Sequence, residues 1–240
     1  MTALLEVRGL SKRFGGFVAL GDIDLDVAEG ERVGLIGPNG SGKSTLVNCV
    51  CGTLRHEGGT VRFAGHALNG LPPYRRTRLG VARSFQLPRP FVGMSLADNL
   101  RIPLEYALRH RGGEAAIAAR CHALLASVGL EGKAAQRPAE LTQIEMRKLE
   151  LARAMAAEPR LLIADEAMAG LSHQEVDEIL ALLLRLNQQG VTVIMIEHIM
   201  RAVMQFSQRL VVLVAGRKIA DGEPDLVIRD PEVERAYLGE

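Results

Sequence analysis

Apolar and polar residues follow two periods along the chain, and together these periods predict a protein built from both strands and helices. Strict alternation predicts strands over 3–8 and 16–27; in the second, Ile23, Leu25 and Val27 share one face and aspartates occupy the other. Short apolar runs predict further strands over 32–36, 60–64, 81–85, 161–164, 191–196 and 209–214. Amphipathic periods predict helices from residue 43 onward and over 95–126, 142–157, 172–189, 199–206 and 224–240.

The order of these elements predicts an α/β fold with a helical insertion. In the second half of the chain strands and helices alternate, which is typical of a parallel sheet covered by helices on both faces. The stretch 95–126 instead predicts two helices interrupted at 111–113, and the second places Ile117, Cys121, Leu124 and Leu125 on one face. A proline-braced segment over 87–91 precedes this insertion. We therefore expect the chain to enter a different subdomain there.

One stretch matches the phosphate-binding pattern G-x-x-x-x-G-K-[ST] at every specified position. It comprises Gly37, Pro38, Asn39, Gly40, Ser41, Gly42, Lys43, Ser44 and Thr45. An apolar strand precedes it and a helix follows it, so glycines, backbone N–H groups and the helix dipole all favour a bound anion. Lys43 is expected to reach the β- and γ-phosphates of a nucleotide, and the Ser44 hydroxyl to hold Mg²⁺. The alternative, a glycine-rich surface turn, does not explain the lysine and hydroxyls.

Four other residues are candidates for chemistry, and two of them, His198 and Phe14, also have a structural interpretation. Asp165 and Glu166 follow a buried run at what would be the carboxyl end of a parallel strand, where ligands collect. His198 follows the next strand along, and a lone histidine in such a place is usually a hydrogen-bonded structural residue. Phe14 is either a core residue or a surface on which a base stacks; taken alone, the pattern favours the core.

Composition narrows the function classes. A formal net charge of +1 gives no general argument for a nucleic-acid partner. Five arginines over 75–89 (Arg75, Arg76, Arg78, Arg83 and Arg89) allow a nucleic-acid or headgroup patch, but the scarcity of interleaved aromatics favours a solvated face or a protein-docking rim. The three cysteines, Cys49, Cys51 and Cys121, lack metal-ligand or paired spacing, which indicates reduced thiols in a cytoplasm. No run reaches the roughly 18 to 20 apolar residues of a membrane span, and no signal-peptide core begins the sequence.

Taken in order, the motifs resemble the ATPase subunit of an ATP-binding cassette (ABC) transporter over nearly the whole chain. The resemblance rests on Gln86, the stretch 141–154 and the Asp165-Glu166 pair, together with the phosphate-binding stretch. The chain is most similar to the importer type for branched-chain and other hydrophobic amino acids. Four stretches carry this finer similarity: Arg13-Phe14-Gly15-Gly16, Ala169-Gly170-Leu171, Ile196-Glu197-His198 and Arg235-Ala236-Tyr237-Leu238-Gly239.

The resemblance implies a fold and a set of roles. It implies a P-loop NTPase (RecA-like) core with an antiparallel β subdomain over 1–85 and 157–240, and an α-helical subdomain over 86–156, in one cassette of 240 residues. Phe14 would stack on adenine, which reverses the preference for the core. Ser44, Gln86 and Asp165 would surround Mg²⁺, with Gln86 also contacting the attacking water. Glu166 would be the general base, and His198 the residue near the γ-phosphate.

The chain departs from the family at its signature sequence. Where the family has Leu-Ser-Gly-Gly-Gln, this chain has Leu141, Thr142, Gln143, Ile144 and Glu145. In the family each ATP lies between the phosphate loop of one subunit and the signature of the other. We therefore expect side chains in place of the two glycines, and the charge of Glu145, to weaken the site facing this signature. Two further departures are Ala167, where the family usually has proline, and Ser172, where it usually has aspartate. We expect both to alter the communication between the two ATP sites of the dimer.

These features together predict an ATP-hydrolysing importer subunit that binds ATP and Mg²⁺. Its implied partners are a second ATPase subunit, in a hetero- or homodimer, and transmembrane permeases, with an external solute-binding protein as a further candidate and no nucleic acid. The altered signature favours a heterodimer with one competent and one weakened site. Its expected place is the cytoplasmic face of the membrane, as a peripheral subunit. Two alternatives remain: a regulatory subunit with weak hydrolysis, and a soluble ABC-type ATPase acting on nucleic acid or ribosomes.

Overall fold

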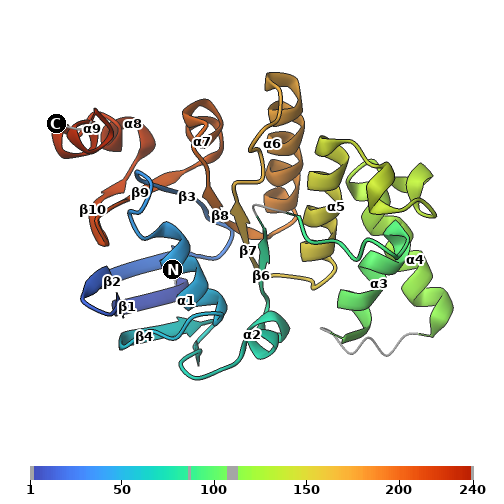
Figure 1. Cartoon of the computed structure of the whole chain (residues 1–240), viewed down its shortest axis with the longest axis horizontal. Coiled ribbons are helices and arrows are strands. Elements are labelled where there is room, and N and C mark those ends of the chain that lie inside the picture. The colour runs from blue at the N-terminus through green and yellow to red at the C-terminus, as the bar shows by residue number, and fades with distance from the viewer. Residues whose placement is uncertain (1–2, 86–87, 107–112, 239–240) are drawn as a thin grey trace.

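A six-stranded sheet forms the centre of the molecule in the computed structural model, which describes residues 3–85, 88–106 and 113–238 (Figure 1). Its strand order is β10-β9-β3-β8-β7-β6. The strands are β3 (Arg32–Ile36), β6 (Val81–Ser84), β7 (Leu161–Asp165), β8 (Thr192–Ile196), β9 (Arg209–Val214) and β10 (Arg217–Gly222). All neighbours are parallel except β10, which pairs antiparallel with β9. The predicted apolar runs over 32–36, 81–85, 161–164, 191–196 and 209–214 became parallel strands of this sheet, whereas the run over 60–64 lies in the second sheet.

The second sheet is antiparallel and has the order β2-β1-β4-β5. It contains β1 (Ala3–Phe14), β2 (Phe17–Ala28), β4 (Gly58–Phe63) and β5 (His66–Ala67). The expectation that the first strand stops at residue 8 was wrong. Gly9, at φ 58°, lies where the pairing of β1 with β2 shifts between Val7 and Leu10, so a bulge bends the strand without ending it. As a result Phe14 lies at the tip of a long hairpin.

Helices cover both faces of the central sheet. The longer ones are α1 (Lys43–Cys51), α3 (Leu96–Tyr106), α4 (Glu114–Ser127), α5 (Gln143–Met155) and α6 (His173–Gln188). The shorter ones are α2 (Pro73–Leu79), α7 (Met200–Phe206), α8 (Pro224–Val227) and α9 (Pro231–Leu238), with single 3₁₀ turns at Glu131–Lys133 and Pro138–Glu140. Along β7, Leu161 and Ile163 pack toward the cluster that contains α1 and the small sheet, whereas Leu162 packs toward α5 and α6. Because successive side chains of a strand point to opposite faces of the sheet, β7 contributes residues to both hydrophobic cores.

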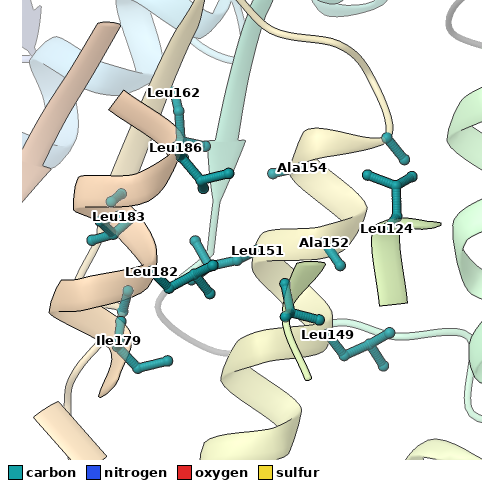
Figure 2. Close-up of a cluster of buried hydrophobic side chains, with 14 of the residues drawn as sticks. Leu124, Leu149, Leu151, Ala152, Ala154, Leu162, Ile179, Leu182, Leu183 and Leu186 are labelled. Carbon is teal, nitrogen blue, oxygen red and sulfur yellow. The ribbon is translucent and has the colours of Figure 1, made fainter. Parts of the chain in front are cut away.

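The helices α3, α4 and α5 pack together beside the sheet (Figure 1). The predicted face of α4, with Ile117, Cys121, Leu124 and Leu125, is buried as expected. Figure 2 shows that Leu151 of α5 points toward Leu182 of α6, while Leu149 lies on the opposite side of α5. Because α5 is buried on both of these sides, its N-terminus is held in a fixed position relative to the sheet.

Candidate phosphate and hydrolysis site

The phosphate-binding stretch forms a tight loop between β3 and α1. Gly37, Gly40 and Gly42 have φ of 147°, 78° and 107°, values that side-chain-bearing residues rarely adopt. A Cβ on Gly37 would lie 2.0 Å from the carbonyl oxygen of Leu213, so the loop has no space for one there. Gly42 caps α1 without any side-chain hydrogen bond, which leaves the first N–H groups of the helix available to an anion.

Lys43 turns its ammonium group into this loop. Its Nζ donates to the carbonyl oxygens of Gly37 at 2.7 Å and Pro38 at 3.0 Å, and the residue is 6 % exposed. Burial lowers the pKa of Lys43, and the nearby carboxylates of Glu166 and Asp165 oppose that shift. A buried cation with two carbonyl partners and no direct counter-ion in this loop is suited to an incoming polyphosphate. Ser44, one residue further, is exposed in the first turn of α1.

Asp165 ends β7 close to the loop and is 4 % exposed. Arg83 of β6 forms an ion pair with Asp165 and also donates to Oδ1 of Asn48, at 2.6 Å, on α1. Sequence reasoning missed this partner of Asp165, because the two residues meet only through the pairing of β6 with β7.

Glu166 leaves the strand in an unusual conformation. Its φ is 48°, and its N–H donates to the carbonyl oxygen of Ile196 at 2.8 Å. Its Oε1 lies 2.8 Å from Nε2 of His198, and the Glu166 side chain is 18 % exposed. The structure therefore brings together two residues that are 32 positions apart and that were selected separately from the sequence.

The signature region begins α5 as predicted. Thr142 accepts from the Glu145 N–H at 3.4 Å, and Glu145 accepts from the Thr142 N–H at 3.0 Å, completing a capping box. Glu145 also pairs with Lys133 at 2.7 Å, and both contacts lower its pKa. A lysine from a neighbouring turn thus offsets part of the negative charge that we expected to weaken the site facing this signature.

The two residues that replace the signature glycines behave differently. Ile144 is only 9 % exposed and packs in the core, so its side chain does not project from the start of α5 as we expected. Gln143 is exposed, and its Nε2 lies 3.4 Å from the carbonyl oxygen of Ala169. Leu141 is partly buried against the same core. Of the two substitutions, only Gln143 therefore places a side chain at the exposed helix start.

The structure also shows the exposure of Phe14 and of the arginines over 75–89. Phe14 is 51 % exposed, so the interpretation of it as a core residue was wrong. The arginines over 75–89 were predicted to form a solvated face or a protein-docking rim, and Arg76 departs from both: it is 4 % exposed and donates to the carbonyl oxygens of Cys49 and Val50 at the end of α1. Gln86 lies outside the described residues.

A family model described as "ABC transporter" matches residues 20–169 of the chain. The chain belongs to the ABC transporter family. It is 38% identical to the high-affinity branched-chain amino acid transport ATP-binding protein BraF of Pseudomonas aeruginosa, over 99% of this chain and 98% of that protein. It is 36% identical to the corresponding LivG of Escherichia coli K12, again over 99% and 98%.

Solved ABC cassettes have the same fold. A nucleotide-free ATP-binding cassette from an ABC transporter superimposes with a TM-score of 0.90 at 29% identity, covering all of both chains. An ADP-bound cassette gives 0.90 at 30% identity with the same coverage, and a dimeric bacterial cassette gives 0.83 at 25% identity over 92% of this chain and 98% of that one. The chain thus has the P-loop NTPase fold of an ABC ATPase.

This ABC cassette also has an apolar groove of about 430 Å³ between α2, β6, α3 and α5. Exposed aromatic residues line it, among them Tyr74, Phe85 and Phe91. In the parts of the chain that the structure describes, no helix is both long and apolar enough to span a bilayer.

The donors near the loop fit Mg²⁺ held jointly with a nucleotide. Ser44 offers a hydroxyl and Asp165 a carboxylate, both hard oxygen ligands. Across the described ranges no group of three or more His, Cys, Asp or Glu forms a metal site by itself. Two protein oxygens completed by phosphate oxygens and water are the arrangement that Mg²⁺ prefers at nucleotide sites.

Proposed function

We propose that this ATPase powers an importer of branched-chain or related hydrophobic amino acids. The observation that carries the proposal is the 2.8 Å contact between Glu166 and His198 at the strand ends beside the phosphate loop. It supplies a carboxylate base and a neighbouring proton-bearing group where the terminal phosphate would lie. The substrate class is supported by near-full-length similarity to proteins named for branched-chain amino acid transport.

Each residue has a distinct part in the proposed reaction. The loop N–H groups and Lys43 hold the phosphates of ATP, while the exposed ring of Phe14 stacks on the adenine. Mg²⁺ at Ser44 and Asp165, with Gln86 contributing from outside the described residues, would neutralise charge that develops on the phosphates. Glu166 accepts a proton from the attacking water, and His198 orients Glu166 through its Nε2.

We further propose that the chain works in a dimer with a second ATPase subunit. The N-terminus of α5 still presents N–H groups and the Thr142 hydroxyl to a partner's ATP, but Gln143 stands where the family has glycine. This favours a heterodimer in which the site facing this signature is the weaker one. A homodimer of the purified chain with a high rate that Thr142→Ala abolishes would contradict the asymmetry.

The apolar groove is the proposed docking site for the permease. Arg83 of β6 lines the groove and forms the ion pair with Asp165. A permease segment docked in the groove would therefore be linked to the nucleotide site through Arg83. Exposed aromatic residues of this kind mark interaction surfaces on otherwise polar proteins. Such docking would hold the subunit at the cytoplasmic face of the membrane, and a solute-binding protein would act on the other side.

The proposal is tested by Glu166→Gln in the full chain, measured alone and after co-expression with a candidate partner ATPase subunit and permeases. Loss of a general base should lower the rate of phosphate release about 10²- to 10⁴-fold while ATP still binds. Glu178→Gln on the exposed face of α6, which removes an ion pair with Lys148, is the matched control. An unchanged rate would favour the regulatory-subunit alternative, and stimulation by RNA rather than by the permease would favour the soluble-ATPase alternative.

A further inference from the structure

The two chain segments that leave β7 and β8 are cross-linked beyond the ends of the strands. Asp165 and Ile196 are the last paired residues of the two strands. The Glu166 N–H then donates to the carbonyl oxygen of Ile196, and the Glu166 side chain contacts His198. A third link, through Glu197, completes this arrangement.

Glu197 is buried directly after β8, with 4 % of its surface exposed. Its Oε1 accepts from the Met168 N–H at 2.8 Å, and its carboxylate also interacts with the backbone N–H of His198. Burying a carboxylate is costly unless it is hydrogen-bonded or paired with a positive charge, so a buried one is expected to have such partners. Here one carboxylate contacts the segment that carries the proposed base and the segment that carries its histidine.

Arg147 contacts the same segment from α5. It is 7 % exposed, its Nη2 donates to the carbonyl oxygen of Ala169 at 3.1 Å, and its charge interacts with that of Glu197. The Met168 N–H thus binds the carboxylate of Glu197, and the carbonyl of the next residue, Ala169, binds the guanidinium of Arg147. Together these two contacts hold the backbone segment that follows Glu166 in place.

We propose that Glu197 is a positioning residue that sets the geometry of the Glu166–His198 pair. Glu166 adopts a positive φ, which persists only where surrounding contacts over-determine it. Glu197 supplies such a contact two residues later, at Met168, while sitting next to His198 in the chain. This inference rests on the proposed role of Glu166 as the base.

Three variants of the full chain test the role, assayed with its partner ATPase subunit if turnover needs one. Glu197→Leu fills the buried space but leaves the Met168 N–H without an acceptor, whereas Glu197→Gln keeps an oxygen for it. We expect Glu197→Leu to lower kcat about 10- to 100-fold with KM for ATP unchanged, because a misplaced base costs rate rather than affinity. Glu197→Gln should restore most of the rate. Arg147→Met, which removes the shorter of the two side-chain contacts to the Ala169 carbonyl oxygen, should change kcat in the same direction and provides the test if Glu197→Leu folds poorly.

The control is Glu31→Ala, which removes a carboxylate that likewise accepts a backbone N–H, from Ala28 at 2.7 Å, far from the site. If Glu197 acts through Glu166, Glu197→Leu should add little in a Glu166→Gln background. An equal loss in both backgrounds, or a Glu197→Gln variant as slow as Glu197→Leu, overturns the role. If Glu166→Gln lowers the rate but Glu197→Leu does not, only the positioning role of Glu197 is wrong. If Glu166→Gln leaves the rate unchanged, the proposed role of Glu166 as the general base is wrong as well.

Discussion

Arg83 and Asp165 form a buried ion pair between the neighbouring parallel strands β6 and β7, with side-chain exposures of 14 % and 6 %. Removing one partner of a buried pair leaves the other charged and uncompensated. We expect Arg83→Met to lower the free energy of unfolding by about 3 kcal/mol, measured by urea unfolding. If Asp165 is a magnesium ligand, Mg²⁺ alone should stabilise this variant more than the wild type, since the cation replaces the lost guanidinium charge.

The matched control for this prediction is Arg62→Met, because Arg62 is an exposed arginine whose side chain donates to the carbonyl oxygen of Gly65. Its stability and its response to Mg²⁺ should match those of the wild type. Equal Mg²⁺ stabilisation of Arg83→Met and the wild type would argue against a cation at Asp165.

The sequence predicted those parts of the site that short segments encode by themselves. The phosphate loop, the helix that begins after Thr142 and the acids at the end of β7 are each set by neighbouring residues, and the structure has the loop and the start of this helix as expected. The partner of Asp165 and the burial of Ile144 depend instead on strand pairing and helix packing between distant segments. Glu197 was noted only as part of a motif, because nothing local shows that its carboxylate reaches Met168.

Lys43 should contribute to nucleotide affinity more than to stability. Its ammonium is buried and bonded only to neutral oxygens, so methionine, which is of similar length and uncharged, should be accommodated. We expect Lys43→Met to weaken binding of a fluorescent ATP analogue about 10- to 100-fold, the effect of losing charge-assisted hydrogen bonds to phosphate. Lys218→Met, which removes a surface ion pair with Asp221, should bind normally. Comparable losses in both variants would argue against a specific phosphate contact.

Phe14 should contribute to binding through its ring. It lies at the hairpin tip with the Lys12 ammonium 5.2 Å from the ring centre, and its exposure leaves the other face open for a base. Loss of stacking by Phe14→Ala should cost about 1–3 kcal/mol of affinity for adenine nucleotides, measured by titration calorimetry. Tyr74→Ala removes an equally exposed ring in the groove and should leave the affinity unchanged. If Phe14→Ala binds ATP with the affinity of the wild type, Phe14 does not stack on the adenine.

The burial of Glu197 predicts a pH dependence of stability with a definite sign. Burial raises the pKa of this carboxyl from 4.5 to about 7, with Glu166 raising it and His198 lowering it, and with the Arg147 charge nearby. Between these values the folded protein holds a proton that the unfolded chain has lost. The free energy of unfolding should therefore fall as pH rises through this window and level off above about pH 7, by at most about 3 kcal/mol.

Glu197→Gln isolates this contribution, because the amide does not titrate while other carboxyls, such as Glu145 with its lowered pKa, affect both proteins alike. Urea unfolding at about pH 5 and about pH 8 should show the variant gaining stability relative to the wild type as pH rises. Parallel curves for the two proteins would mean that Glu197 titrates near its ordinary value and that the fold does not oppose its charge. In that case the contacts of the carboxylate with the N–H groups of Met168 and His198 would offset the cost of burying its charge.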